Sequence, residues 1–350
     1  MEPTNSPKVA VAILCWNGKE FLTKFLPSIV RSDYPNFEVY VIDNLSQDTS
    51  VSFVKNEYPD VKVIEMGKNL GFAGGYNTAL KEIEADYFII LNQDVQVDPG
   101  WIFPIVEMME NDGEIAACQP KVKAFYEQTH FEYAGAAGGF IDYLGYPFCR
   151  GRVFDHSEED KGQFDDAIEI SWASGAALFI RPKVFFDMGG FDEDFFAHME
   201  EIDLCCRIKN AGYKIMYCPD SVVYHVGGGS LAQGHPKKIY LNFRNSLRTT
   251  LKNYPSSGIF RVMLLRFILD DIAAVRALLR FKFKEFFAIA KADAHFVLSL
   301  PKWIGKRKQT NKMTKEKGIG KSRLQENGFY SKSIVWQYFM NKKKTFKELF

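Results

Sequence analysis

The 350-residue sequence predicts an α/β protein: a Rossmann-like, mainly parallel central sheet with helices on both faces, followed by C-terminal amphipathic helices. Two observations lead to this prediction. Between residues 9 and 119, short runs rich in β-branched and aromatic residues alternate with helical patterns, which is typical of a parallel sheet with crossover helices. Beyond residue 236, apolar residues recur at helical spacing among many Lys and Arg.

The alternation places the elements of the first part of the chain. Strands are predicted at residues 9–14, 37–42, 61–64, 87–91 and 115–117. Helices are predicted at residues 20–30 and 78–84. Pro99 suits the first position of a further helix that runs to Glu110, since proline is favoured where no backbone N–H is needed.

The middle of the chain changes character. Residues 120–170 are rich in Gly, Tyr and Phe without clear periodicity, which is typical of loops that shape a pocket. His225 is then predicted at a strand end, next to a glycine-rich segment at 226–234 that could close over a ligand. The other elements expected here are a strand at 176–180, a short helix between Arg181-Pro182 and Gly189-Gly190, a helix at 200–211 that stops at Gly212, and strands at 214–217 and 221–224.

Charge is distributed unevenly along the chain. Residues 237–350 hold 26 Lys/Arg against 7 Asp/Glu, whereas the preceding residues hold 18 against 36. We therefore expect the basic region to meet an anionic membrane surface. Packing onto the α/β domain, a homodimer contact and a solvated tail remain alternatives. The predicted divisions are an N-terminal tail (1–7), an α/β catalytic domain (8–236, with halves 8–119 and 120–236) and a basic helical region (237–350).

Composition also bears on the compartment. The six cysteines include no C-x-x-C pair, which argues against a zinc site or a disulfide framework and favours a reducing cytosol. The first residues lack the features of a secretory signal. The apolar residues 259–279 are interrupted by charges and should not cross a bilayer. We expect a cytoplasmic protein, peripheral on the inner face of the cytoplasmic membrane, with no nucleic-acid partner.

Two segments predict nucleotide binding. Asp43 ends a strand, where a carboxylate can accept hydrogen bonds from a nucleobase or a ribose; its alternative role is to cap the next turn. The glycine-rich run 68–77 opens a helix whose N-terminus favours anions. Because its glycines do not match G-x-G-x-x-G, the run counts against a dinucleotide-dependent dehydrogenase.

Acidic residues at two further places predict the chemistry. Asp94 follows a buried strand and is a candidate ligand for a divalent cation, with His225 completing the site. Glu200 and Glu201 begin a helix, where one carboxylate could face a pocket and act as a base. Asp203 and Arg207 are spaced as a helical ion pair. A base and a metal together suffice for sugar transfer from a nucleotide.

Seven motifs occurring in one order resemble family 2 glycosyltransferases, particularly their bacterial rhamnosyltransferase-like branch, over about residues 8–250. The resemblance implies a GT-A fold, inverting transfer from a nucleotide sugar and a divalent metal, Mn²⁺ or Mg²⁺. The motifs are Trp16-Asn17-Gly18, Val41-Ile42-Asp43-Asn44 with Ser46 and Asp48, Asn69 to Asn77, Leu91-Asn92-Gln93-Asp94, Gly189 to Glu193, Glu200 to Leu204, and His225.

The resemblance also implies roles for residues at the matching positions. Glu201 would be the base, with Glu200 as its alternative; the family usually has Glu-Asp at this pair. Asp94 would bind the metal, although Asn92-Gln93-Asp94 replaces the frequent Asp-x-Asp, and His225 would bind the metal or the diphosphate. Donor contacts would come from Trp16, Asn17, Asp43, Asn69, Gly71, Gly74, Asn77 and Asn92, and acceptor contacts from Trp172 and Asp203.

The sequence thus predicts a glycosyltransferase that moves a sugar such as rhamnose from a dTDP- or UDP-sugar donor to a cell-surface glycan or its lipid-linked precursor. The alternative is a non-catalytic, membrane-associated relative that binds without turnover. A nucleotidyltransferase is disfavoured, since Cys15-Trp16-Asn17-Gly18 provides no basic, glycine-rich phosphate loop after the first strand.

Overall fold

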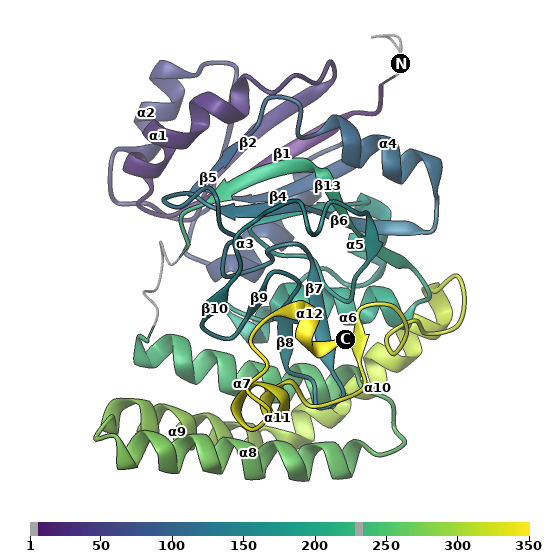
Figure 1. Ribbon diagram of the computed structural model, residues 1–350. Helices are drawn as coiled ribbons and strands as arrows, with labels where there is room; N and C mark the ends of the chain where they lie inside the picture. Colours follow the sequence, from purple (N-terminus) through teal and green to yellow (C-terminus); the bar gives the residue numbers. More distant parts are fainter. Residues whose placement is uncertain (1–5, 228–233) are drawn as a thin grey trace.

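The computed structural model describes residues 6–227 and 234–350 (Figure 1). In this part of the chain the central sheet has the order β11-β13-β6-β12-β4-β1-β2-β3, and β5 pairs with β13. Its strands are β1 (Val9–Cys15), β2 (Phe37–Asp43), β3 (Lys62–Glu65), β4 (Tyr87–Asn92), β5 (Val95–Val97), β6 (Ile115–Ala124), β11 (Ile168–Glu169), β12 (Ala177–Ile180) and β13 (Lys214–His225).

The sheet is parallel in two places. β1 pairs in parallel with β2 and β4, β2 with β3, and β6 with β13. β12 runs antiparallel between β4 and β6 and joins the two parallel parts, while β5 and β11 are antiparallel to β13. The predicted α/β class with a Rossmann-like central sheet is confirmed, with antiparallel strands on one side.

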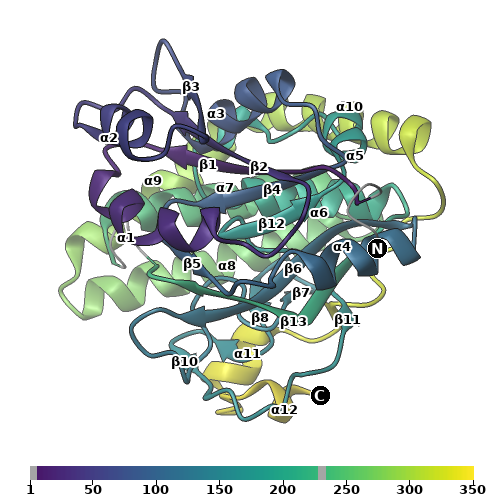
Figure 2. The same ribbon diagram turned by 90° about the horizontal axis from the view of Figure 1, so that it is seen from above.

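Helices cover both faces of the sheet (Figure 2). Side chains alternate along β1, so that Val11 packs with α1, α2 and α4 while Ala12 packs with α3, α5 and α6. Both faces are therefore buried, as a sheet with crossover helices requires. The helices are α1 (Lys19–Val30), α2 (Ser50–Glu57), α3 (Gly71–Ala79), α4 (Phe103–Asn111), α5 (Pro182–Asp187) and α6 (Glu200–Asn210), with 3₁₀ turns at Leu80–Glu82 and Glu193–Phe195.

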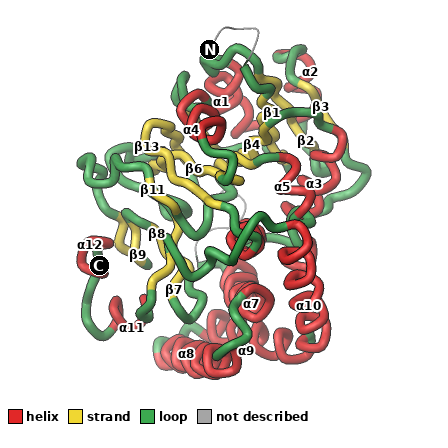
Figure 3. The backbone as a smooth tube through the Cα atoms, turned by 90° about the vertical axis from the view of Figure 1, so that its right-hand side faces the viewer, coloured by secondary structure: helices red, strands yellow, loops and turns green. Residues whose placement is uncertain are grey.

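The C-terminal region forms a helical layer beside the sheet and then returns to it (Figure 3). Its helices are α7 (Pro236–Asn253), α8 (Ile259–Leu279), α9 (Phe283–Leu298), α10 (Leu300–Lys317), α11 (Ile334–Phe339) and α12 (Phe346–Leu349). Trp303, Ile334 and Leu349 are buried in the same hydrophobic cluster as the sheet. Residues 237–350 therefore share the core of the preceding domain.

A second sheet occupies the segment that was predicted as loops. In the described residues its order is β10-β9-β8-β7-β14. The prediction missed it because these strands are short and lack alternating polarity. They are β7 (Gly139–Asp142), β8 (Pro147–Cys149), β9 (Arg152–Val153), β10 (His156–Ser157) and β14 (Phe329–Tyr330).

Other predicted elements need correction. Pro99 lies in a turn, accepting the Asp33 N–H, and α4 begins only at Phe103. The expected strands at 214–217 and 221–224 are a single strand, β13, with a register shift between Cys218 and Val222. α2 was not predicted because it buries only Ser50 and Val54. Most of the glycine-rich segment 226–234 and most of the N-terminal tail lie outside the described residues.

The basic segment 302–323 is poor in apolar residues, yet much of it is the helix α10. Trp303 is fully buried and packs edge-to-face on Phe195, with ring centroids 5.4 Å apart. Lys306 forms ion pairs with Asp192 and Asp194. Part of the basic charge is therefore balanced by the acidic α/β domain, which is one of the alternatives that the sequence left open.

Among the residues that the structure describes, no helix is both long enough and apolar enough to span a bilayer.

Candidate active site

The carboxyl ends of β1, β2 and β4 meet at one edge of the sheet, as ligand sites of open α/β sheets require. The register aligns Cys15 with Asp43, and Leu14 with Asn92. Trp16 follows β1 directly and its side chain is 51% exposed. An exposed indole at this edge offers a flat face on which a nucleobase could stack.

Asn17 and Asp43 shape the loop beside Trp16. Asn17 has a positive φ of 49°, and its Oδ1 accepts the Gln47 N–H at 2.7 Å. The buried Asp43 carboxylate accepts the Ser46 N–H at 3.2 Å and 3.3 Å. Asp43 therefore braces the turn after β2, which is its alternative role, and it does so at the edge where the donor is expected to bind.

Asp94 and His225 are brought together by two strands. β13 pairs with β5 so that His225 lies opposite Val95, next to Asp94. His225 Nε2 is 3.2 Å from Asp94 Oδ1 and 3.3 Å from Asn92 Nδ2. Asp94 and His225 are buried. The three side chains, predicted from motifs about 130 residues apart, thus form one cluster at the carboxyl edge.

The sequence gave no sign of a fourth member of this cluster, Glu132. Its Oε1 lies 3.5 Å from His225 Nδ1, on the side opposite Asp94. Burial lowers the pKa of His225, but the carboxylates of Glu132 and Asp94 more than offset this and raise it to about 10. Glu132 was missed because it lies in the aperiodic segment, placed by backbone pairing with Val122.

The residues at this corner fit a divalent cation. In the described chain no three His, Cys, Asp or Glu side chains are grouped to hold a metal. Asp94 and His225 nevertheless offer two ligand side chains, the imidazole once a bound cation has displaced its proton, and Mg²⁺ and Mn²⁺ are commonly held by one or two protein groups plus substrate phosphates. Glu132 lies on the second nitrogen of the imidazole, where a carboxylate typically orients a metal-binding histidine.

Glu200 and Glu201 open α6, as predicted. Glu200 is buried, and the Oε2 atoms of both residues are buried without a hydrogen-bond partner in the described part of the chain. Burial raises the pKa of Glu201 to about 7, and burial together with the Glu201 charge raises that of Glu200 well above its usual range. A carboxyl group with a pKa near neutral suits a general base.

The backbone that leads into Glu200 is strained. Phe196, His198 and Met199 all have positive φ, between 67° and 75°, which costs energy for residues other than glycine. Asn245 of α7, fully buried, holds this segment: its Nδ2 lies within hydrogen-bond distance of the carbonyl oxygens of Phe195 at 3.1 Å, Ala197 at 3.0 Å and His198 at 2.8 Å. Asn245 is thus a positioning residue for the start of α6.

We expect Asn245→Leu to lower kcat about tenfold to a hundredfold, because the segment that aims the carboxylates of α6 loses its donor. The three carbonyl groups would also lose a partner, costing on the order of 2 kcal/mol of unfolding free energy. Rates measured against pH should show a displaced inflection, whereas donor KM should change little. Asn341→Leu, at an exposed C-terminal position, is the control. Unchanged kcat and pH profile would contradict the positioning role.

The glycine-rich motif serves packing. Asn69 Oδ1 accepts the Gly71 N–H at 2.9 Å and lies 3.2 Å from Asn44 Nδ2. Gly71 has φ of 69°, and a Cβ there would approach the Phe196 carbonyl oxygen to 3.0 Å; a Cβ on Gly74 would approach Leu70 equally closely. The motif therefore brings α3 against the strained segment, so its glycines act on the site through packing.

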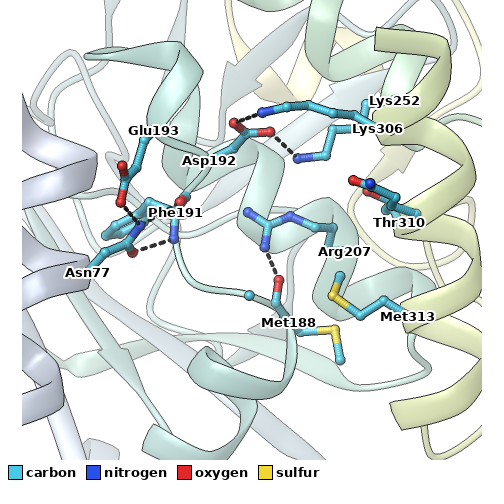
Figure 4. A pocket seen from close by; sticks show the side chains of 12 residues that line it. Asn77, Met188, Phe191, Asp192, Glu193, Arg207, Lys252, Lys306, Thr310 and Met313 are labelled. Carbon is cyan, nitrogen blue, oxygen red and sulfur yellow. Dashed lines mark hydrogen bonds and ion pairs between the residues drawn. The ribbon is translucent and has the colours of Figure 1, made fainter. Parts of the chain in front are cut away.

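Asn77 does not have the predicted donor-binding role. Its amide donates to the Phe191 carbonyl and accepts the Phe191 N–H, both at 2.8 Å. Figure 4 shows it facing this turn at the rim of a pocket of about 440 Å³. The polar groups of the pocket pair with one another, for example Asp192 with Lys252 and Lys306. Asn77 is therefore a structural residue that fixes the 190–193 turn.

The two predicted acceptor residues also need correction. Trp172 is buried, its Nε1 donates to the Phe140 carbonyl at 2.9 Å, and the backbone of Gly139 packs directly against its ring. Asp203 is fully buried and pairs with Arg207, Lys252 and Asn253 at 2.7–2.9 Å. Trp172 is core, and Asp203 ties α6 to α7; neither is accessible to an acceptor.

A sheet edge that carries Asp43 and Asn92, an acid–imidazole pair and carboxylates at a helix start are the arrangement expected of one class, the nucleotide-sugar glycosyltransferases of the GT-A fold. The model of the family described as glycosyl transferase family 2 matches residues 10–185, half of the chain. The chain belongs to this family and is a glycosyltransferase. The predicted family and enzyme class are confirmed.

The chain is similar to named family members. It is 26% identical over 234 residues to the N-acetylglucosaminyl-diphospho-decaprenol L-rhamnosyltransferase of Mycobacterium tuberculosis, covering 63% of this chain and 75% of that one. It is 20% identical over 220 residues to the rhamnosyltransferase WbbL of Escherichia coli, covering 60% and 80%. The rhamnosyltransferase-like character predicted from the motifs is supported by these names.

Solved structures share the fold. The mannosyltransferase of Pyrobaculum calidifontis, in complex with GDP-Man and Mn²⁺, has a TM-score of 0.51 at 18% identity over 90% of this chain and 88% of that one. GalNAc-T7 with UDP, GalNAc and Mn²⁺ has a TM-score of 0.57 at 17% identity, covering 71% of this chain but only 48% of the other. At these identities the likeness concerns the fold.

Proposed function

We propose that this glycosyltransferase moves a deoxyhexose such as rhamnose, with inversion, from a dTDP- or UDP-sugar to a hydroxyl group of a lipid-linked glycan precursor. The names of the relatives from Mycobacterium tuberculosis and Escherichia coli support the sugar, and the former supports the lipid-diphosphate acceptor. The observation that carries the transfer chemistry is Glu201, a carboxyl group with a pKa of about 7 at the start of α6.

In the proposed reaction Glu201 accepts the proton of the acceptor hydroxyl. The oxygen then attacks the anomeric carbon, the bond from that carbon to the diphosphate oxygen breaks, and the nucleoside diphosphate leaves with the bonding electrons. Glu201 has an Oε2 without a partner and lies beside Gly175, whose missing side chain leaves room next to the carboxylate stem. Glu201 Oε2 can therefore receive a proton without breaking a hydrogen bond within the described residues.

The leaving diphosphate would be held at the acid–imidazole corner. Asp94 and His225 would be the protein ligands of a divalent cation, with Asn92 beside them and Glu132 orienting the imidazole. Such a cation supplies positive charge that stabilises the departing diphosphate. Trp16 and Asp43 would contact the nucleoside, because they lie at the ends of the adjacent strands.

One observation counts against the alternative function, a non-catalytic, membrane-associated relative. Glu200 and Glu201 are kept buried with raised pKa values, which destabilises the charged carboxylates, and such costs are typical of functional sites. We place the proposed reaction on the cytoplasmic side of the membrane, where nucleotide sugars would be available. A homodimer is not required, since the proposed residues all come from one chain.

A thermal-shift panel with UDP, dTDP and GDP tests the donor. Because a ligand that binds only the folded state raises its stability, we expect an increase in Tm with dTDP or UDP that grows when Mn²⁺ is added. A transfer assay with the matching nucleotide sugar and a lipid-diphosphate-linked N-acetylglucosamine then tests the acceptor. A cooperative melt without a shift for any nucleotide would contradict the proposal.

A further inference from the structure

Helix α8 buries two charged residues and leaves large apolar residues on its solvent side. Its buried residues are Met263, Arg266, Asp270, Ala274 and Ala277. Its solvent side carries large apolar residues between 46% and 81% exposed, spaced three or four apart so that they line one face. We call this face the outer stripe; it consists of Phe260, Leu264, Ile268, Ile272, Val275 and Leu279.

The inward charges of α8 have partners, which explains why the helix packs this way round. Arg266 donates to Ser246 Oγ of α7 at 2.9 Å and to the Leu144 carbonyl at 3.2 Å. Asp270 accepts the Tyr146 hydroxyl at 3.2 Å. These buried contacts fix the rotation of α8 about its axis. The outer stripe is consequently held on the solvent side and cannot turn inward.

The apolar surface continues around the turn into α9. Phe281, Phe283 and Phe287 are all at least half exposed, and α8 and α9 form the outermost layer of the molecule (Figure 1). Contiguous exposed apolar surface of this extent marks an interaction site in a folded protein. Its occupant should therefore be apolar where it meets the outer stripe.

Basic side chains flank the apolar residues. Within α8, α9 and the turn between them, all of which the structure describes, Asp271 is the single exposed acid, and the partly exposed Glu285 pairs with Lys282 at 3.2 Å. The exposed cations are Arg261, Arg276, Arg280, Lys282, Lys284 and Lys291. Unlike the lysines of α10, these cations are not matched by a cluster of acids on the α/β domain. Apolar side chains flanked by Lys and Arg are typical of helices that lie in the surface of a bilayer.

The turn between α8 and α9 lies on the side of the candidate active site. Arg266 of α8 meets Ser246 of α7, and Tyr240 of α7 meets His295 of α9 at 2.7 Å, so the α8–α9 turn extends past the first turn of α7 (Figure 1). That first turn is next to the site, because Lys237 lies over the Phe196 ring, 5.1 Å from its centroid.

We propose that the outer stripe and the aromatic turn after it form a docking surface for an anionic lipid bilayer, entered in the interfacial plane without spanning it. A second copy of the chain is the less suitable occupant, because a two-fold contact through this face would bring its cations against themselves. This inference goes beyond the proposed transfer reaction. Binding to lipid needs neither donor nor acceptor, so the docking surface can be disproved while the transfer reaction stands.

Sedimentation with vesicles tests the proposal on the full chain. We expect binding to phosphatidylcholine vesicles containing phosphatidylglycerol, weaker binding to pure phosphatidylcholine, and weakening by salt. Combining Leu279→Ser, Phe281→Ser and Phe287→Ser should reduce partitioning about tenfold or more, because three exposed apolar side chains are lost. Truncation would be unsuitable, as α10 and β14 belong to the fold.

Met340→Ser, which removes another exposed apolar side chain elsewhere, is the matched control and should bind vesicles like the wild type. Nucleotide-induced thermal shifts should be the same in all three proteins, which shows that the triple variant is folded. Equal vesicle binding by the triple variant and the wild type would overturn the proposal. So would a wild-type dimer that ignores vesicles and becomes monomeric in the triple variant, since the surface would then serve a second copy.

Discussion

Replacing Glu201 with glutamine is expected to lower kcat by roughly 10³-fold, because the amide has the size of the carboxyl group but cannot accept the acceptor proton. Donor binding should persist, since Glu201 lies on α6 and the proposed donor residues lie at the ends of β1, β2 and β4. Single-turnover rates and the nucleotide thermal shift, measured on the same preparation, separate the two effects.

The pH dependence gives a second measurement on the same variant. A base with a pKa of about 7 is protonated and inactive below that value, so wild-type kcat/KM should rise as the pH passes through about 7 and then level off. The glutamine variant should lack this inflection in its residual rate. Glu201→Asp keeps a carboxylate, and it should retain much of the activity that Glu201→Gln loses.

Stability should change in the opposite direction to activity. The folded state holds the Glu201 proton up to about pH 7, whereas an unfolded glutamate releases it near 4.5. The wild type therefore loses stability as the pH rises from 4.5 to 7, and the glutamine variant lacks the part of this loss that Glu201 contributes. At pH 8 we expect the variant to be more stable by on the order of 1–3 kcal/mol in urea unfolding.

Two outcomes would contradict the assignment of Glu201. Full activity in Glu201→Gln together with loss in Glu200→Gln would move the base to Glu200, the alternative that the sequence left open. Absence of transfer in the wild type as well, with a nucleotide thermal shift intact, would favour the non-catalytic relative.

The parts of the site that follow strands could be predicted from the sequence. Asp43, Asn92 and Asp94 come immediately after apolar runs, and parallel strands end at a common edge, so their proximity followed from the pattern. His225 was also placed correctly at a strand end. Its contact with Asp94 depends on the short strand β5, which the sequence did not reveal.

The residues that could not be predicted depend on long-range packing. Glu132 lies in a segment without periodicity, and Asn245 lies on a helix whose polar face gave no hint of a contact with residues 195–198. Conversely, the family resemblance implied site roles for Asn77, Trp172 and Asp203, but their contacts serve the fold. A motif identifies a group of residues, but only their contacts in the structure show which of them face the site and which of them stabilise the fold.

The basic region shows the same distinction for charge. The excess of Lys and Arg after residue 236 suggested an anionic surface, and the structure divides it into two sets. Lys252 and Lys306 face Asp192 in the α/β domain, while the exposed cations of α8 and α9 face solvent beside apolar side chains. Net charge alone could not separate these sets, because it does not show which Lys and Arg side chains meet acids in the folded chain.

Asp94→Asn is expected to abolish the Mn²⁺-dependent part of the nucleotide thermal shift and to lower kcat/KM by about 10³-fold. A carboxylate that binds a divalent cation is replaced by a neutral amide of the same shape, and cation stabilisation of a leaving diphosphate is worth several kcal/mol. The shift produced by nucleotide without Mn²⁺ should remain, because Trp16 and Asp43 are untouched. Titration of Mn²⁺ against the nucleotide-bound protein gives the affinity directly.

Asp98→Asn is the matched control for this prediction. It makes the same substitution four residues further along the same segment. The Asp98 carboxyl is half-buried, burial raises its pKa, and it is not part of the His225 cluster. It should keep both the Mn²⁺-dependent shift and the activity. If Asp94→Asn behaved like Asp98→Asn, the cation would have to be held elsewhere, and the pairing of Asp94 with His225 would then be a structural ion pair. Loss in Asp94→Asn alone would assign the diphosphate end of the site to this corner.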